Sequence, residues 1–402
     1  MSLEIAQQVL LSIFLISVVM GAVVHKTNFC TMGAVSDWVN MGDTGRMKAW
    51  LLAMVVALLG VTALQYMDVF SLDSSRPPYR TSNFAWARYI LGGLLFGIGM
   101  TLASGCGNKI LVRIGGGNMK SVMVFLVAGI FAYLMTKTDF YGLVFHSWMQ
   151  YLTIDFSRHN MTYQDLASVA SGLMGSASVD LYRLLLGLLL SILGLAYVFK
   201  SSDFRSSFDN ILGGVVVGAA VVAAWYATGG TLGQSWQEEA EFMDQVPLGV
   251  ATQSFTFINP MGETLDYLSH AADNLYLTFG VVAVAGVIIG SFIYAIVSRN
   301  FRLEWFSSKE DFITHMIGGV LMGIGGVLAM GCTIGQGVSG ISTLSLGSFM
   351  AFGSIVLGSA LTMKVQYYKM VYEDEATFGQ AFITGLVDIK LLPERLRKLE
   401  AV

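Results

Sequence analysis

Nine apolar stretches, each long enough to cross a lipid bilayer, recur along this 402-residue chain. A helix needs roughly 20 mostly apolar residues to span about 30 Å of hydrocarbon. Only 12% of the residues are charged, against roughly a quarter in soluble proteins. Because backbone polar groups in lipid must hydrogen-bond within their own segment, the pattern predicts an all-α polytopic membrane protein. The expected spans are Ile5–Val24, Lys48–Tyr66, Trp86–Ala103, Met119–Thr136, Leu181–Phe199, Ile211–Tyr226, Leu275–Val297, Phe312–Met330 and Leu346–Met363.

Basic residues are distributed unevenly, and their positions predict the orientation of the chain. No Lys or Arg occurs between Arg205 and Arg299, although this interval contains a long acidic loop. Because cytoplasmic loops carry an excess of Lys and Arg, we expect this loop outside. Counting spans from the loop places the N-terminus outside and the C-terminus in the cytoplasm. The same count leaves four basic residues outside, against the rule: Arg76, Arg80, Lys137 and Arg158.

The first and last segments of the chain and its charge pattern bear on its topology and on its ligands. The first stretch lacks a basic start and an Ala-x-Ala exit, so we expect a permanent helix and not a cleaved signal peptide. The short polar segment after Met363 is predicted to form a surface helix from Glu373 to Leu399. No basic tract interleaved with aromatic residues occurs, so nothing in the sequence supports nucleic-acid binding.

A long motif occurs twice with its spacing unchanged. The first copy is Gly92-Gly93-x3-Gly97-Ile98-Gly99-x3-Ala103-x-Gly105-Cys106. The second copy is Gly318-Gly319-x3-Gly323-Ile324-Gly325-x3-Ala329-x-Gly331-Cys332. Each copy carries an apolar span into a glycine-rich break at a cysteine. Two helices broken at equivalent places are typical of transporters that contain internal repeats.

A weaker match extends the duplication to the whole chain. Met32-Gly33-x3-Asp37-Trp38 corresponds to Met261-Gly262-x3-Asp266-Tyr267, which sets Asn259 opposite Cys30. One extra span between two four-span halves makes the second half run opposite to the first, so we expect inverted repeats about an axis in the membrane plane. The predicted segments are a first repeat (1–137), an outer loop with a linking span (138–207), a second repeat (208–363) and a cytoplasmic tail (364–402).

All three cysteines of the chain interrupt apolar segments, together with polar residues of no evident packing value. Irregular backbone at membrane depth persists only where protein or a water-filled cavity satisfies it, so these breaks should converge on one pathway. The alternative is that the glycines only allow close packing and that Lys109 reaches the membrane surface. The expected path residues are Cys30, Cys106, Cys332, Ser104, Asn108, Lys109, Thr333, Gln336 and Asn259, with helix breaks at Gly105, Gly107, Gly331, Gly335 and Gly337.

The chemistry of a thiol favours contact with a passing anion. A protonated thiol is a weak donor without fixed charge, so it can touch an anion without the desolvation cost of a buried cation. No Cys or His spacing suits a metal site, and we expect neither metal nor cofactor. An odd number of cysteines argues against a structural disulfide, although a Cys106–Cys332 pair stays open if the two breaks meet. Helix N-termini at the breaks would add attraction for an anion, and a soft, sulphur-bearing anion would suit the thiols best.

Three motifs resemble those of the YeeE/YedE sulphur-transport family, in the same order along the chain. They are Thr27-Asn28-Phe29-Cys30-Thr31-Met32-Gly33, Gly105-Cys106-Gly107-Asn108-Lys109, and Gly331-Cys332-Thr333-x-Gly335-Gln336-Gly337-x-x-Gly340-x-Ser342. The resemblance implies a carrier in the bacterial inner membrane that imports thiosulfate or a related sulphur compound, with the cysteines acting as a relay. It also implies a small cytoplasmic sulphur-carrier or rhodanese-like protein as partner. Gln336 stands where many members have His.

Three other functions stay open at this point. A membrane thiol enzyme could take sulphane sulphur as a persulfide and pass it to a cytoplasmic carrier, but a nucleophilic cysteine needs an activating group, and only Lys109 lies close in sequence. The substrate could be a selenium compound, since some relatives are tied to selenium metabolism. A small-solute channel in which the cysteines only pack is the third alternative. We expect a transporter and not an enzyme.

Overall fold

The computed structural model describes residues 2–159, 161–175, 178–243 and 245–400. The residues outside this description are 1, 160, 176–177, 244 and 401–402. Each of them falls within one of the four segments predicted from the sequence. Within the described residues nine helices are long and apolar enough to cross a membrane, which confirms the nine predicted spans. They are α1 (Ser2–Thr27), α3 (Gly45–Tyr66), α4 (Trp86–Leu102), α6 (Met119–Lys137), α9 (Val179–Lys200), α11 (Phe208–Gly229), α14 (Phe279–Val297), α15 (Lys309–Leu328) and α16 (Leu346–Tyr372).

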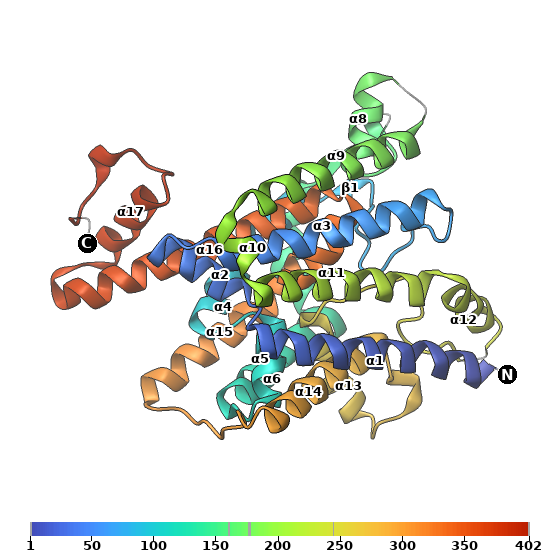
Figure 1. Cartoon of the computed structure of the whole chain (residues 1–402), viewed down its shortest axis with the longest axis horizontal. Helices are drawn as coiled ribbons and strands as arrows, with labels where there is room; N and C mark the ends of the chain where they lie inside the picture. Colours follow the sequence, from blue (N-terminus) through green and yellow to red (C-terminus); the bar gives the residue numbers. More distant parts are fainter. Residues whose placement is uncertain (1, 160, 176–177, 244, 401–402) are drawn as a thin grey trace.

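The long helices run roughly along one axis of the molecule, with the N-terminus at one end and the C-terminus at the other (Figure 1). The polar interruptions between them form short helices. These are α2 (Thr31–Ser36) with η1 (Asp37–Met41), α5 (Gly107–Gly115), α10 (Ser202–Ser206), α12 (Thr231–Glu241), α13 (Ile258–Ser269), η5 (Asn274–Tyr276), and η6 (Gly335–Gly340) with η7 (Ile341–Thr343).

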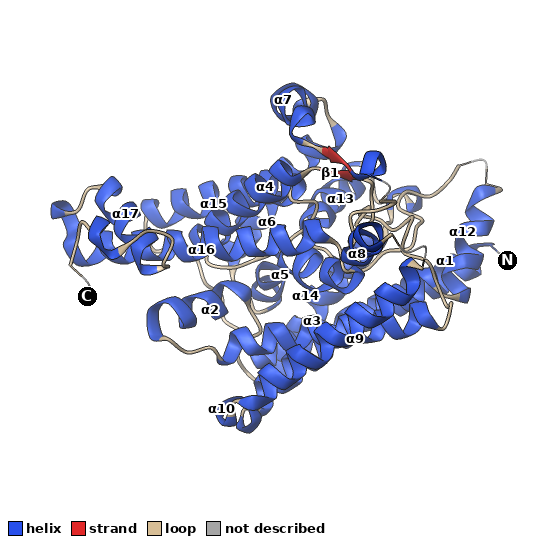
Figure 2. Ribbon diagram, turned by 90° about the horizontal axis from the view of Figure 1, so that it is seen from above, coloured by secondary structure: helices blue, strands red, loops and turns tan. Residues whose placement is uncertain are grey.

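The segment between α6 and α9 is folded. It contains η2 (Gly142–His146), α7 (Ser147–Met149), η3 (Gln150–Leu152), β2 (Ile154–Asp155), η4 (Phe156–His159) and α8 (Leu166–Met174). β2 pairs antiparallel with β1 (Asn83–Phe84), a small departure from the predicted all-helical structure (Figure 2). Backbone hydrogen bonds then fasten the segment to the start of α16: the Leu166 N–H donates to Leu344, and the Leu346 N–H donates to Gln164.

Helices α4 and α15, which carry the two copies of the glycine motif, pack directly against each other. A Cβ atom at Gly99 would lie 2.8 Å from the Gly318 oxygen, and one at Gly92 would lie 2.8 Å from the Gly325 oxygen. The start of each motif therefore contacts the end of the other, so the two helices are antiparallel. Glycine is needed here because the backbones approach more closely than any side chain permits.

Helices packed around this crossing form matched pairs. α4 also packs against α16, and α15 packs against α6. α1 packs against α14, and α3 packs against α11. The largest apolar core is continuous through these contacts and includes all three cysteines. The cysteines therefore lie in the interior of the bundle.

The C-terminal tail differs from the prediction. α16 continues nine residues beyond the predicted end of its span, and the expected surface helix from Glu373 to Leu399 is wrong in extent. The tail instead forms η8 (Glu373–Glu375), α17 (Phe378–Asp388) and η9 (Glu394–Leu396). Thr377 and Gln380 make a capping box that starts α17 afresh. Lys390 has a φ of 61°, which ends helical backbone before Pro393.

Candidate functional site: a buried thiol cluster

Each cysteine lies at the start of a short helical segment. Cys30 and Cys106 have extended backbone (φ −155°, ψ 129° and φ −75°, ψ 170°) and precede α2 and α5. Their carbonyl oxygens accept the first helical hydrogen bonds, from Ala34 and Ile110. The carbonyl of Cys332 likewise accepts from the Gln336 N–H at 2.8 Å. Since the first N–H groups of a helix lack partners within it, each cysteine stands at a positively polarised end.

The duplicated motif builds the same turn before Cys106 and before Cys332. Ser104 and Met330, at equivalent positions, both adopt left-handed backbone, with φ values of 57° and 60°. The next residue closes each helix: the Gly105 N–H donates to Met100 at 2.9 Å, and the Gly331 N–H donates to Gly326 at 2.8 Å. This is the hydrogen-bond pattern of a Schellman cap, so the sequence repeat is also a local structural repeat.

The three cysteines come together although they are far apart in the sequence. The thiols of Cys30 and Cys106 lie in hydrogen-bonding contact with each other. A Cβ atom at Gly107 would lie 3.7 Å from the Cβ of Cys332, so the third cysteine is adjacent. The exposed fractions of Cys30, Cys106 and Cys332 are 4%, 1% and 0%, and all three are free thiols. We call these three residues the thiol cluster.

Side chains beside the thiol cluster carry polar atoms that the protein leaves unpaired. Of the buried oxygens that make no conventional hydrogen bond among the described residues, four belong to the polar interruptions: Thr31 Oγ1, Asn108 Oδ1, Asn259 Oδ1 and Thr333 Oγ1. The Thr333 hydroxyl does contact the Cys106 thiol. Each oxygen belongs to the first turn of a short helical segment at one of the interruptions. Because buried polar groups are nearly always paired, such a concentration points to a ligand.

Cys332 also contacts the segment that precedes α13. The Thr256 hydroxyl lies 4.0 Å from Cys332 Sγ, and the Gly335 N–H donates to the same sulphur at 3.5 Å. Phe255 and Phe257 on either side of Thr256 are fully buried and stack with their centroids 6.0 Å apart. The second half of the chain therefore supplies one polar side chain to Cys332, and two buried rings fix the segment that carries it.

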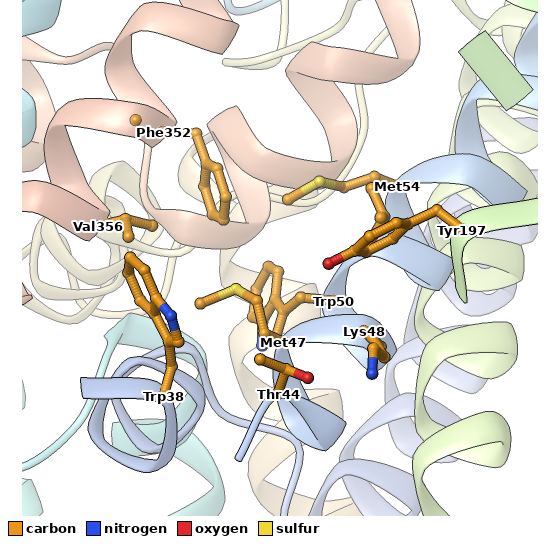
Figure 3. A pocket seen from close by; sticks show the side chains of 11 residues that line it. Trp38, Thr44, Met47, Lys48, Trp50, Met54, Tyr197, Phe352 and Val356 are labelled. Carbon is orange, nitrogen blue, oxygen red and sulfur yellow. The ribbon is translucent and has the colours of Figure 1, made fainter. Parts of the chain in front are cut away.

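Aromatic packing fixes the residue before Cys30. The ring of Phe29 stacks on Trp50 of α3 with a centroid distance of 4.6 Å, and Trp50 in turn lies 6.0 Å from Phe352 of α16. Trp50 also forms part of the wall of an apolar cavity of about 480 Å³ (Figure 3). Stacked rings therefore connect the residue before Cys30 to that wall.

Positive charges lie on one side of the thiol cluster. Lys109 donates to the Asn28 side chain, Arg46 is paired with Asp37, and both cations are close enough to act electrostatically on Cys30. A cavity of about 320 Å³ opens beside Lys109. Four basic side chains and one carboxylate are among its lining residues: His25, Lys109, Arg113, Arg302 and Glu304. We call this cavity the basic vestibule.

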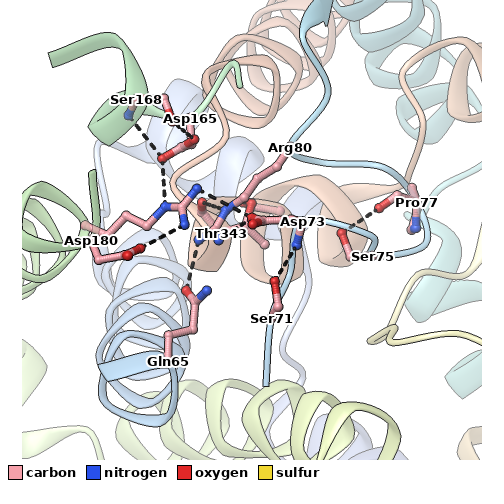
Figure 4. A network of polar contacts seen from close by, with 12 residues as sticks. Gln65, Ser71, Asp73, Ser75, Pro77, Arg80, Asp165, Ser168, Asp180 and Thr343 are labelled. Carbon is pink, nitrogen blue, oxygen red and sulfur yellow. Dashed lines mark hydrogen bonds and ion pairs between the residues drawn. The ribbon is translucent and has the colours of Figure 1, made fainter. Parts of the chain in front are cut away.

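A network of ion pairs and hydrogen bonds holds the 333–343 segment, which follows Cys332 (Figure 4). The Tyr79 hydroxyl donates to the Gly335 carbonyl at 2.7 Å, and Arg80 Nε donates to Thr343 at 3.3 Å. Arg80 is only 2% exposed and pairs with Asp73 at 3.3 Å. Arg183 joins Asp73 to Asp165 at distances of 3.5 and 3.3 Å. The network thereby ties the loop between α3 and α4, the residue before α8 and the start of α9 to the end of the segment.

Burial and neighbouring charges shift the pKa values in this network in opposite directions. Burial lowers the pKa of Arg80 to about 10. Burial alone would raise the pKa of Asp165, but the positive charges of Arg80 and Arg183 outweigh it and leave the pKa below its ordinary value. Both groups therefore stay charged near neutral pH. A cavity of about 460 Å³ beside the network is lined in part by Gln65, Arg183 and Ser342.

The structure gives some of the predicted path residues other contacts. Gln336 Nε2 donates to the Ala329 carbonyl at 2.6 Å, and its Oε1 accepts from Ser348 at 2.6 Å. The Ser104 carbonyl accepts from Arg113 at 2.8 Å. Cβ atoms at Gly105 and Gly331 would contact Lys109 and Gln336, and those at Gly335 and Gly337 would contact Thr256 and Phe352. Asp37 and Asp266, which occupy corresponding positions of the weaker repeat, pair with Arg46 and Lys137.

Sequence reasoning missed three side chains at the cluster. Thr31 directly follows Cys30, so the motif could have indicated it. Arg46 and Thr256 lie in segments without a motif, and only folding brings them to Cys30 and Cys332. Within the described part of the chain, no three His, Cys, Asp or Glu side chains are arranged to hold a metal ion.

Comparisons of the chain with known proteins find similarity to sulphur transporters. A family model for sulphur transport matches residues 26–361. The chain is 24% identical over 374 residues to the thiosulfate transporter TsuA of Escherichia coli (strain K12), covering 87% of this chain and 92% of that protein. It is 23% identical over 347 residues to the thiosulfate transporter TsuA of Spirochaeta thermophila (strain ATCC 700085 / DSM 6578 / Z-1203), covering 86% and 95%.

Proposed function

The chain belongs to the sulphur transport family, and from this premise we propose that it imports thiosulfate, or a closely related small sulphur anion, through the thiol cluster. The observation that carries the proposal is the convergence of three free thiols inside a membrane-spanning bundle, with buried oxygens of Thr31, Asn108 and Asn259 left unpaired at the same interruptions. The names of the two TsuA relatives support thiosulfate as the substrate.

The cluster suits an anion that must bind and then leave. Free N–H groups at the starts of α5 and α13 attract negative charge. The thiols of Cys30, Cys106 and Cys332 add weak contacts without a fixed charge, and the hydroxyls of Thr31 and Thr333 can donate further hydrogen bonds. Conduction requires contacts strong enough for entry and weak enough for exit. The amides of Asn108 and Asn259 and the backbone of Gly107, Gly331 and Gly335 complete the proposed path.

The proposed direction of transport is from the side of the Arg80 network to the basic vestibule. The vestibule lies where the orientation rule places the cytoplasm, and Lys109 with Arg46 would draw an anion past Cys30. We propose a bacterial inner-membrane location with the N-terminus in the periplasm. A small sulphur-carrier or rhodanese-like protein is the partner that we propose at the cytoplasmic end.

The proposed architecture is a pair of inverted repeats, 1–137 and 208–363, with α9 as the link and residues 364–402 as the tail. In the α4–α15 crossing, Gly92 meets Gly325 and Gly99 meets Gly318, which is the reciprocal pattern of a two-fold contact. The helices are antiparallel, so that two-fold axis would lie across them, in the plane of the membrane. The pairs α4–α16 and α15–α6, and α1–α14 and α11–α3, support the same correspondence.

The test is thiosulfate-dependent growth and uptake of labelled thiosulfate in bacteria that lack other sulphate and thiosulfate importers. Wild type should take up the label, and Cys30→Ala, Cys106→Ala and Cys332→Ala should each fail at normal membrane levels. Ser191→Ala is the matched control, because Ser191 is a small, fully buried polar residue of α9. Uptake that survives in all three cysteine variants would return the thiols to a packing role. No uptake by wild type would remove thiosulfate as the substrate.

A further inference from the structure

An apolar cavity of about 480 Å³ is lined by residues that lie outside the thiol cluster. It lies between three membrane-spanning helices, α3, α9 and α16, and the short η1 helix (Figure 3). Most of its lining is aliphatic or aromatic. Figure 3 shows Met47, Trp50, Met54, Tyr197 and Phe352 among the side chains that line it.

The cavity has a buried floor and an exposed rim. Trp50, at 1% exposure, belongs to the floor, whereas Trp38 and Tyr197 are 45% and 59% exposed. Since α3, α9 and α16 are candidate membrane spans, the rim formed by Tyr197 of α9 would lie next to lipid. Tryptophan and tyrosine favour the boundary between apolar chains and headgroups. The rim therefore has the composition expected for an opening towards the bilayer.

Two polar groups distinguish this cavity from a simple apolar gap. Lys48 lies in the first turn of α3 and has no ion-pair partner among the described residues, and Figure 3 shows its ammonium group pointing away from the aromatic rings. The Trp50 indole N–H is buried and makes no hydrogen bond among those residues. A phospholipid offers what both groups lack: a phosphate for the cation and ester oxygens for the N–H.

We propose that this cavity is a binding site for one acyl chain of an anionic phospholipid, with the lipid phosphate beside Lys48. An aqueous occupant is excluded by the apolar lining, because water needs several polar partners. An acyl chain fills the cavity, and attraction of a basic residue for an anionic lipid is about 1 kcal/mol at a membrane surface. Because Trp50 stacks on Phe29, next to Cys30, the lipid supports one wall of the thiol cluster.

Gly353 offers a clean way to close the site. It lines the cavity on α16, and a Cβ atom placed there would meet no atom within 4 Å. Gly353→Leu therefore fills the cavity without a backbone clash. Val356→Phe fills it from a second lining position. Gly379→Leu is the matched control, because Gly379 of α17 has equally open space outside the cavity.

The experiment uses the full-length protein in bilayers that contain phosphatidylglycerol with a photoreactive diazirine in one acyl chain. After illumination, mass spectrometry locates the labelled residues. We expect label at Met54 and Val356. The label at Met54 should fall at least about tenfold in Gly353→Leu and Val356→Phe but stay in Gly379→Leu. Label on the exposed face of α9, such as Leu189 and Ile192, shows that each variant is folded and in lipid.

A second arm tests the headgroup. Lys48→Gln should reduce labelling from phosphatidylglycerol about fivefold and should leave labelling from the zwitterionic phosphatidylcholine analogue unchanged. Labelling of the lining residues that persists in both filled variants would overturn the proposal. Cross-links from these residues to a second copy of the chain would also overturn it, because the cavity would then be a subunit contact. None of these outcomes depends on whether thiosulfate is the transported anion.

Discussion

At the position of Asn108, a negatively charged side chain would favour the helix but would repel a passing anion. It is 1% exposed in the first turn of α5, and its Oδ1 has no hydrogen-bond partner among the described residues. An acidic residue near a helix N-terminus is ordinarily favourable to the helix, by about 0.3–1 kcal/mol. In an anion path the same charge repels the substrate, by about 4 kcal/mol at 4 Å with an effective dielectric constant of 20.

We therefore predict that Asn108→Asp lowers uptake at least about tenfold while the protein stays folded. Asn108→Ser, which keeps a small neutral polar group, should retain most activity. The measurement is initial uptake of labelled substrate normalised to membrane level, with thermal stability in detergent as the check on folding. Equal activity of the Asp and Ser variants would show that no anion passes Asn108.

Gln336 makes structural hydrogen bonds at both ends of its amide, to Ala329 and Ser348. Gln336→Met keeps the volume and leaves a buried carbonyl and a hydroxyl unpaired, so we predict a loss of roughly 2 kcal/mol or more in stability. Thermal unfolding in detergent measures it. The control is Gln7→Met, at an exposed position of α1. Unchanged stability together with lost uptake would instead assign Gln336 to the substrate.

At the scale of single residues, the sequence indicated the thiols through the repeat. Cys106 and Cys332 occupy equivalent positions, so their proximity followed once the two halves were expected to meet. The neighbourhood of each thiol could not be predicted as well. Thr256 approaches Cys332 from an extended loop, and no periodicity or motif marks such a loop before it folds.

At the scale of helices, the α4–α15 crossing is the contact that holds the two breaks together. A Cβ atom at Gly92 would lie 2.4 Å from the Ala329 nitrogen, three residues before Cys332. Overpacking of this kind costs about 1–3 kcal/mol. We predict that Gly92→Ala lowers both the unfolding temperature and the uptake.

Gly353→Ala is the matched control for this substitution, because a Cβ atom there has open space and the change should be neutral or stabilising by about 0.5–1 kcal/mol. Detergent-solubilised protein heated in steps and passed over a size-exclusion column gives the two unfolding temperatures. Equal temperatures for the two variants would mean that α4 and α15 do not meet as closely as described.

The nine spans were predictable because hydrophobic length alone decides membrane crossing. The exact ends of the spans were less predictable. α14 begins at Phe279 and not near Leu275, because Thr278 caps it. The buried network of Arg80, Arg183 and Asp165 had no sequence signal, since its charges come from two separate loops and the start of α9. Long-range pairing of this kind depends on the folded arrangement of the 138–178 segment.

At the scale of the whole molecule, three of the basic residues that opposed the orientation rule have acidic partners. Arg80 pairs with Asp73, Lys137 with Asp266, and Arg158 with Asp155. We predict that the C-terminus is cytoplasmic: a C-terminal green fluorescent protein fusion should fluoresce, and a C-terminal alkaline phosphatase fusion should be inactive. The reverse pattern would invert the proposed direction of transport. A fusion after Glu241 in the acidic loop serves as the opposite control.

The central claim is that the intact anion passes a cluster of thiols, and purified protein in liposomes tests it most directly. Thiosulfate labelled with ³⁵S at either the sulphane or the sulphonate position is supplied outside, and the label inside is counted. The account predicts equal entry of both labels through wild type and none through Cys106→Ala. Sulphane label held on the protein, with the sulphonate label left outside as sulphite, would contradict it, because a cysteine thiolate would then have cleaved the S–S bond and kept the outer sulphur as a persulfide.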